Sequence, residues 1–261
     1  MKPTTNIKFW LSSLSLLLSV LLVSTACRAN EPLPAVKENT AQAPSSALLA
    51  STEDMGEEYL DSFIFFGEST TYHLKSRGVL RGGTETTQVW GSDNGTAMLD
   101  PTIASLRIRY PETGELLTLS EAVKKKQPQR MLLCFGLNGA VQFKKRGSDY
   151  FKDCYRLLLN EIQAASPQTS IVIASCFPVA ENMDMSRYSV TLDELNGIID
   201  EINTWALELC EEEELSYLAV NEVLKDERGR LKMKYQNGDG HHLTREAYLE
   251  ILKYLRTHGA K

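Results

Sequence analysis

Three short polar segments of the sequence carry side chains that could act together on an ester or a similar acyl group. GEST contains Ser69, GLNG contains Asn138, and DGHH contains Asp239 and His242. A serine hydroxyl becomes a nucleophile only beside a base, and a histidine oriented by a carboxylate is a base of this kind. An amide N–H can stabilise the oxyanion that forms when the hydroxyl attacks a carbonyl. The three segments therefore contain the parts of a serine hydrolase.

Each segment also has a structural interpretation. Ser69 or Thr70 could be a helix N-cap, for which serine and threonine are preferred. An asparagine between glycines is ordinary turn chemistry, and the histidines could lie in a solvated turn. Asp239 and His242 are three residues apart, however, a spacing that brings both side chains to one side of a turn. On that geometry His241 points elsewhere.

The elements that must position these residues alternate between strands and helices. Five short runs are continuously apolar or β-branched, which is typical of strands covered on both faces in a parallel sheet. They are FIFF (63–66), TTQVW (86–90), RMLLCF (130–135), SIVIAS (170–175) and SYLAV (216–220).

Amphipathic helices are predicted between these strands. Apolar residues recur at helical spacing over residues 151–162 and 192–209, and Thr191 and Glu194 form a capping box before the second of these. A last helix follows Thr244. The order predicts an α/β fold, a three-layer α/β/α sandwich around a mostly parallel five-stranded sheet. Such sheets bind ligands at the carboxyl ends of their strands, where GEST and GLNG are expected.

In this order and context the segments resemble the conserved blocks of the GDSL-like, or SGNH, hydrolase family. The family has GDS after the first strand, a glycine after the second, GxN after the third and DxxH before the last helix. The matches here are Gly67-Glu-Ser69, Gly91, Gly136-Leu-Asn138 and Asp239-Gly-His-His242. The resemblance covers residues 60–258 and implies the family's flavodoxin-like fold.

The resemblance implies a role for each matching residue. Ser69 is the expected nucleophile, His242 the base and Asp239 the residue that orients it. The oxyanion hole is expected to combine the N–H groups of Ser69 and Gly91 with the side chain of Asn138. Gly95 or the pair Gly82-Gly83 could replace Gly91.

Two positions depart from the family pattern. Glu68 stands where the family usually has aspartate, and Gly139 stands where an acidic residue often follows the asparagine. Neither carries a proton in the expected mechanism, so we expect altered support of the loops and retained chemistry. His73, four residues after Ser69, has no evident carboxylate partner and is interpreted as a surface or packing histidine.

The N-terminus has the three parts of a signal peptide, predicted over residues 1–26. Lys2 and Lys8 precede the uncharged stretch FWLSSLSLLLSVLLV and a small-residue segment that ends at Cys27. A transmembrane helix, which needs about 20 apolar residues, is the competing interpretation. VSTAC resembles a bacterial lipobox and favours lipidation at Cys27, although ordinary cleavage after Ala26 fits as well. Residues 27–57 are expected to form a flexible stalk, and residues 58–261 the hydrolase domain.

Charge and cysteines restrict the partners. Without residues 1–26 the chain has 26 basic and 34 acidic residues, a net charge of −8, which disfavours nucleic acid. Cys134, Cys154, Cys176 and Cys210 allow three disulfide pairings but lie in apolar patterns, which favours free buried thiols. No CxxC spacing is present, and neither a metal nor a cofactor is expected.

The expected function is that of an exported serine esterase. Its substrate is predicted to be a small acyl ester, an acetyl ester in the first place, on cell-wall or extracellular carbohydrate, cleaved through an acyl-enzyme. The alternative is a non-catalytic surface lipoprotein that binds glycan or peptidoglycan in the same cleft. A membrane contact is expected through lipidated Cys27.

Overall fold

The computed structural model describes residues 45–93 and 95–259. The predicted signal peptide, Cys27 and residues 27–44 of the predicted stalk lie outside this part, so those assignments stay predictions. The description below concerns the compact unit that spans Ala43–Lys261. No helix in the described residues is long and apolar enough to cross a membrane.

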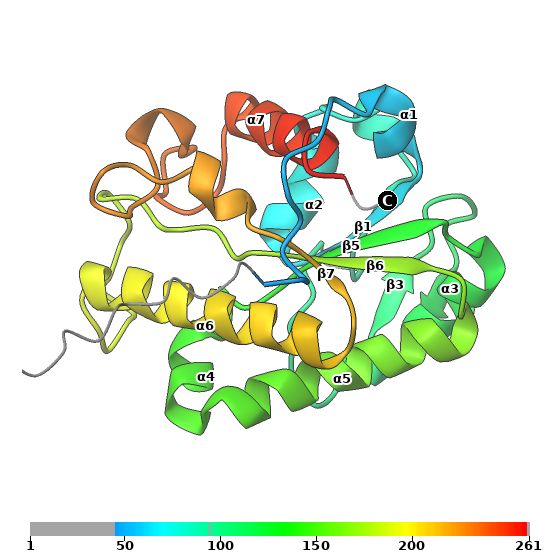
Figure 1. Ribbon diagram of the computed structural model, residues 1–261, viewed down its shortest axis with the longest axis horizontal. Helices are drawn as coiled ribbons and strands as arrows, with labels where there is room; N and C mark the ends of the chain where they lie inside the picture. The colour runs from blue at the N-terminus through cyan, green and yellow to red at the C-terminus, as the bar shows by residue number, and fades with distance from the viewer. Residues whose placement is uncertain (1–44, 94, 260–261) are drawn as a thin grey trace, which may run out of the picture. The chain divides into compact units, whose positions relative to one another are not determined.

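A five-stranded parallel sheet forms the centre of this unit (Figure 1). The strand order is β2-β1-β5-β6-β7, and all four pairings are parallel. The strands are β1 (Phe63–Gly67), β2 (Val89–Trp90), β5 (Arg130–Cys134), β6 (Ser170–Ala174) and β7 (Ser216–Leu218). Each coincides with one of the five predicted runs, which confirms the predicted fold class.

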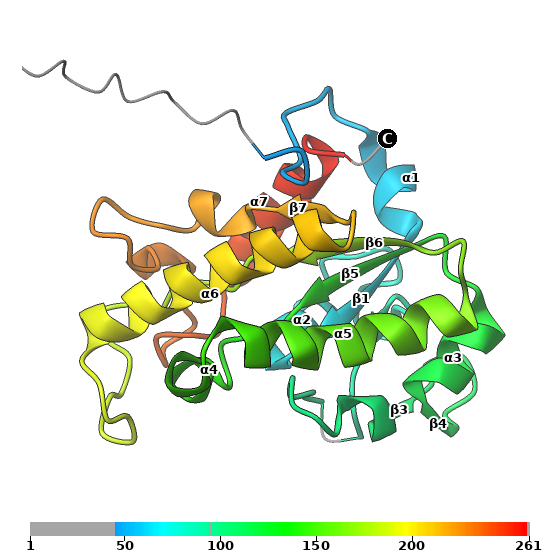
Figure 2. The same cartoon turned by 60° about the horizontal axis from the view of Figure 1, so that its bottom comes forward.

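Helices cover both faces of the sheet (Figures 1 and 2). One face carries α3 (Leu119–Lys126), α4 (Ala140–Arg146), α5 (Ser148–Ala165) and α6 (Leu192–Glu212), and the other carries α1 (Gly56–Asp61), α2 (Ser69–Ser76) and α7 (Arg245–Arg256). Side chains of a strand alternate between the two cores. Along β1, Ile64 and Phe66 pack with the first group of helices, and Phe63 and Phe65 pack with the second.

The predicted helix caps are present. The Thr191 hydroxyl accepts the N–H of Glu194, and the Glu194 carboxylate accepts the N–H of Thr191, as a capping box requires. Thr244 caps α7 by accepting the N–H of Ala247. All four described cysteines are buried and free.

An antiparallel hairpin between β2 and α3 was not predicted. It consists of β3 (Arg107–Arg109) and β4 (Leu116–Thr118). Arg107 and Arg109 are exposed and only Ile108 between them is buried. The segment therefore lacks the continuous apolar run by which the strands of the central sheet were identified.

Residues upstream of Glu58, which the sequence places in the stalk, pack on the sheet. Leu48 pairs with Tyr217 of the edge strand β7, and the N–H of Leu49 donates to the carbonyl of Tyr217 at 2.9 Å. Ala47 is buried. Packed structure thus begins before the predicted boundary, because the free edge of β7 offers hydrogen-bonding groups to an extended segment that has no apolar periodicity of its own.

Register explains how distant loops meet at one edge. Gly67 at the end of β1 is aligned with Cys134 at the end of β5, and Phe66 is aligned with Trp90 at the end of β2. The segments that follow these strands therefore leave the sheet side by side, at its carboxyl edge.

Candidate active site

Ser69 is the first residue of α2 and lies just beyond the end of β1. The turn between the two elements requires glycine at position 67, since a Cβ there would lie 2.3 Å from Thr71 Oγ1 and 2.4 Å from the Cys134 carbonyl oxygen. Glu68 occupies the N-cap position, and no side chain caps the helix. Neither Ser69 nor Thr70 is thus the N-cap. The Ser69 hydroxyl is turned toward His242 instead.

A chain of two hydrogen bonds joins Ser69, His242 and Asp239. Ser69 Oγ lies 3.0 Å from His242 Nε2, and His242 Nδ1 lies 2.7 Å from Asp239 Oδ2. An ionised carboxylate only accepts, so the Nδ1 proton is directed at Asp239 and Nε2 is left to accept the serine hydroxyl proton. The structure thus brings together the three residues that the sequence singled out from two distant segments.

The loop holds Asp239 in its charged form. Burial by itself would raise its pKa, but the backbone N–H and imidazole of His242 and the backbone N–H of His241 together hold the pKa of Asp239 well below its usual range. The two N–H groups donate to Oδ1 at 2.9 and 3.0 Å, which leaves Oδ2 to His242. Gly240, between Asp239 and His241, has φ +85°, and a Cβ there would lie 2.5 Å from the Met183 backbone, so this turn requires glycine.

Gly91 and Asn138 lie at the same edge of the sheet. Gly91 directly follows β2, and Asn138 follows β5 in an exposed turn. The Asn138 amide is 3.4 Å from the Thr96 hydroxyl. Gly82 and Gly83 precede β2 and therefore lie toward its amino end, which removes them as alternatives to Gly91. Gly95 packs, like Gly91, against the ring of Tyr72.

Glu68 holds the Asn138 loop through hydrogen bonds to its backbone. Its carboxylate is buried and accepts the backbone N–H of Gly136 at 2.9 Å and that of Asn138 at 3.1 and 3.2 Å. Burial raises the pKa of Glu68 to about 7, although the N–H groups of Gly136, Asn138 and Leu137 oppose the rise. The residue that departs from the family pattern thus serves as a tether between two loops, in line with the loop support expected of it.

Two further histidines flank His242. The rings of His73 and His242 have centroids 4.4 Å apart, and those of His241 and His242 are 4.0 Å apart. Burial, then the nearby charges of His242 and Arg77, lowers the pKa of His73 to about 4, so this ring is neutral at physiological pH. Of the two roles expected for His73, surface or packing, the structure shows packing. The identity of its partner was not predicted, because contacts between segments about 170 residues apart leave no local signal.

Asp239, His241 and His242 form the only group in the described part of the chain whose donor atoms, all within 4.8 Å, could together hold a metal ion. Both Asp239 oxygens and His242 Nδ1 are already bonded within the group, however. A metal would have to break the Asp239–His242 hydrogen bond. The bonding pattern therefore favours acid–base chemistry over metal binding.

Comparisons with known proteins identify the family and the fold of this chain. The sequence profile of the GDSL-like Lipase/Acylhydrolase family matches residues 65–249. No curated protein gives a significant match. Two solved structures share the fold with a TM-score of 0.50. A candidate lipolytic protein of the G-D-S-L family from Desulfitobacterium hafniense is 14% identical over 74% of this chain and 97% of its own. A candidate SGNH hydrolase from Slackia heliotrinireducens is 16% identical over 76% and 98%.

Proposed function

The chain belongs to the GDSL-like lipase/acylhydrolase family, and we propose from this premise that it is a serine esterase that uses Ser69 as its nucleophile. The observation that carries the proposal is the Ser69–His242–Asp239 chain, with distances of 3.0 and 2.7 Å. Both lie in the range over which a base can take a proton from a hydroxyl and be oriented by a carboxylate.

The first half of the reaction forms an acyl-enzyme. Ser69 Oγ attacks the ester carbonyl carbon, and its proton passes to His242 Nε2. The charge of Asp239 stabilises the imidazolium that results. The tetrahedral intermediate then collapses, the bond to the alcohol oxygen breaks, and the alcohol leaves with the proton from Nε2.

The second half regenerates the enzyme. Water gives a proton to Nε2 and attacks the acyl carbon, and the carboxylic acid leaves as Ser69 Oγ takes the proton back. In both halves the oxyanion is expected to accept hydrogen bonds from the N–H groups of Ser69 and Gly91 and from the Asn138 amide. The N-terminal end of α2 adds a favourable dipole.

We assign a short acyl group, acetyl in the first place, to the substrate. The exposed large hydrophobic side chains among the described residues come from different parts of the chain, so they do not belong to one lipase-like apolar insertion; they are Met55, Met98, Leu116, Leu157, Met233 and Leu249. Because the N-terminus is of signal-peptide type, we propose that cell-wall or extracellular carbohydrate carries this acyl group and is the alcohol that leaves.

Export as a lipoprotein anchored through Cys27 is part of the proposal and rests on the sequence alone. Its test is fractionation of cells that express the full chain. Lipidated protein is expected in the membrane fraction, and Cys27→Ser is expected in the soluble fraction. If both variants distribute alike, the lipid anchor is excluded.

Hydrolysis of p-nitrophenyl acetate by the full chain tests the esterase. Ser69→Ala and His242→Ala are expected to lose at least about 10³-fold in kcat. Ser170→Ala, at the exposed amino end of β6, is the matched control and should keep wild-type kcat. A fluorophosphonate probe should label wild type and leave Ser69→Ala unlabelled. A wild-type protein that is neither labelled nor active would be the binding module of the alternative interpretation.

A further inference from the structure

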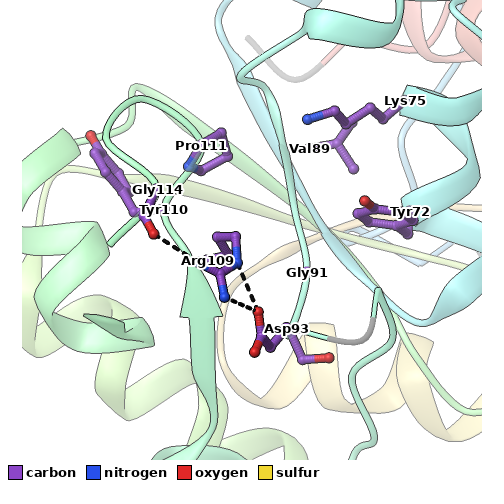
Figure 3. A pocket seen from close by; sticks show the side chains of 10 residues that line it. Tyr72, Lys75, Val89, Gly91, Asp93, Arg109, Tyr110, Pro111 and Gly114 are labelled. Atoms are coloured by element: carbon purple, nitrogen blue, oxygen red, sulfur yellow. Dashed lines mark hydrogen bonds and ion pairs between the residues drawn. The ribbon is translucent and has the colours of Figure 1, made fainter. Parts of the chain in front are cut away.

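A cavity of about 180 Å³ opens beside the segment that follows β2 (Figure 3). Three parts of the chain form its walls: α2, the end of β2 with the residues after it, and the β3–β4 hairpin. The lining residues are Tyr72, Lys75, Val89, Gly91, Ser92, Asp93, Arg109, Tyr110, Pro111 and Gly114. This volume is below the roughly 300–1,000 Å³ of sites for drug-sized ligands, so it suits one small unit.

The cavity shares a wall with the Ser69 site. Ser69, Tyr72 and Lys75 follow one another at steps of three residues along α2, so the Lys75 Cα lies about 9 Å from that of Ser69 along the helix axis. The Tyr72 ring packs against Gly91, where a Cβ would lie 2.9 Å from Tyr72 Cδ2. The cavity and Ser69 thus lie along the same helix, at a separation that a short oligosaccharide can span.

Of the two cations that line the cavity, Arg109 is paired and Lys75 has no ion-pair partner among the described residues. Arg109 Nε donates to Asp93 Oδ1 at 2.7 Å and Nη1 donates to the Gly114 carbonyl at 3.0 Å, so its charge is balanced by Asp93. Lys75 is half-buried and, among the described residues, forms no ion pair or hydrogen bond through its amine. Figure 3 shows this amine extending from α2 toward the opposite wall.

A partly buried ammonium group loses hydration that an anion can replace. Because the lysine ammonium is a compact point charge that donates hydrogen bonds, it can bind either a carboxylate or a phosphate. The chain as a whole has a net charge of −6, so this positive spot beside the site is not a general property of the surface.

We propose that this cavity is a subsite for an anionic oxygen group, a carboxylate or a phosphate, on the alcohol part of the ester, with Lys75 as its counter-ion. The inference rests on the proposed function, since it assigns the acidic character of the substrate that Ser69 attacks. It makes the substrate an acylated acidic glycan instead of a neutral one.

The test measures kcat/KM of the full chain on O-acetylated glucuronic acid, glucose 6-phosphate and glucose. The kcat/KM of wild type is expected to be about tenfold higher on at least one acidic substrate than on acetylated glucose. This factor corresponds to about 1.4 kcal/mol for a partly buried charge pair. Lys75→Met should bring this preference close to one, and Lys75→Arg should restore most of it. Lys124→Met, at an exposed position on α3, is the control and should keep the wild-type preference. Which acidic substrate is favoured tells carboxylate from phosphate.

Equal kcat/KM on acidic and neutral substrates in wild type, or a preference that Lys75→Met keeps, would overturn the inference while p-nitrophenyl acetate hydrolysis still supports the esterase. If wild type hydrolyses no ester, the proposed function fails and ligand-observed NMR decides the subsite. Binding of glucuronate or glucose 6-phosphate that Lys75→Met loses would support it. Absence of binding to wild type would exclude it.

Discussion

The Glu68 carboxylate and the backbone N–H of Asn138 are joined across two loops, with both carboxylate oxygens within 3.1 and 3.2 Å of the same nitrogen. Glu68 immediately precedes Ser69, and Asn138 carries the amide expected in the oxyanion hole. A single buried side chain thus joins the segment of the proposed nucleophile to the segment of the proposed oxyanion donor. Glutamate, one methylene longer than the aspartate usual in the family, still bridges this gap.

Titration of Glu68 should make stability depend on pH. Since burial raises the pKa of Glu68 to about 7 from an ordinary value near 4.5, the folded state holds this proton more tightly than the unfolded state. The stabilisation is therefore present below about pH 4.5 and is lost as pH rises through 7. Relative to Glu68→Gln, wild type should lose on the order of 3 kcal/mol of unfolding free energy between pH 4 and 8.

Urea unfolding of wild type and Glu68→Gln at several pH values measures the difference in their unfolding free energies. Glu250→Gln, at an exposed position on α7, serves as the control and should show no such trend relative to wild type. A constant difference between wild type and Glu68→Gln over the whole range would show that the carboxyl does not titrate in this window.

Asn138→Ala should lower kcat on p-nitrophenyl acetate by about 10²- to 10³-fold with little change in KM, because a donor to the oxyanion acts in the transition state. Asn138 is exposed, so the unfolding free energy should stay close to wild type. Asn160→Ala, at an exposed position on α5, provides the control. A loss confined to KM would place the Asn138 amide in substrate binding only.

His73 should act on catalysis through His242. Its ring lies against that of His242 with a centroid distance of 4.4 Å, and aromatic packing of this kind is worth about 0.5–1.5 kcal/mol. His73→Ala should therefore lower kcat by about 3- to 10-fold, whereas His73→Phe keeps a ring in place and should retain most of kcat.

The pH profile separates this role from a proton-transfer role. With a pKa lowered to about 4, His73 is neutral across the working range, so His73→Phe should leave the shape of the kcat/KM profile above pH 5 unchanged. A new or missing ionisation in that profile would show that His73 exchanges protons during the reaction.

The segment before Glu58 should stabilise the fold. Besides its pairing with Tyr217, it meets α7, where the N–H of Thr52 donates to the Thr257 carbonyl at 2.7 Å and that of Met55 donates to Arg256 at 3.0 Å. A chain that starts at residue 57 loses these bonds and should be less stable by about 2–4 kcal/mol than one that starts at residue 45. Thermal unfolding measures the difference. Equal melting temperatures would show that the segment packs without stabilising.

The sequence predicts what depends on local pattern and on the order of motifs. The apolar runs that became β1 and β5 locate the loops of Ser69 and Asn138, and the spacing of Asp239 and His242 locates the third loop. Long-range pairing has no such local signature. The packing of the His73 ring against His242 and the addition of Leu48 to the edge of β7 depend on which segments meet in space. The same holds for the hydrogen bonds from Glu68 to the Asn138 loop.

Ser69 and His242 are separated by 173 residues, and the Tyr248 hydroxyl of α7 donates to the Thr70 carbonyl at 2.5 Å across 178 residues. During synthesis, which starts at the N-terminus, Ser69 is therefore made long before His242, the proposed base. Under the proposed mechanism, turnover requires the loop before α7 to meet α2, so its onset during refolding reports that contact and not the formation of the sheet alone.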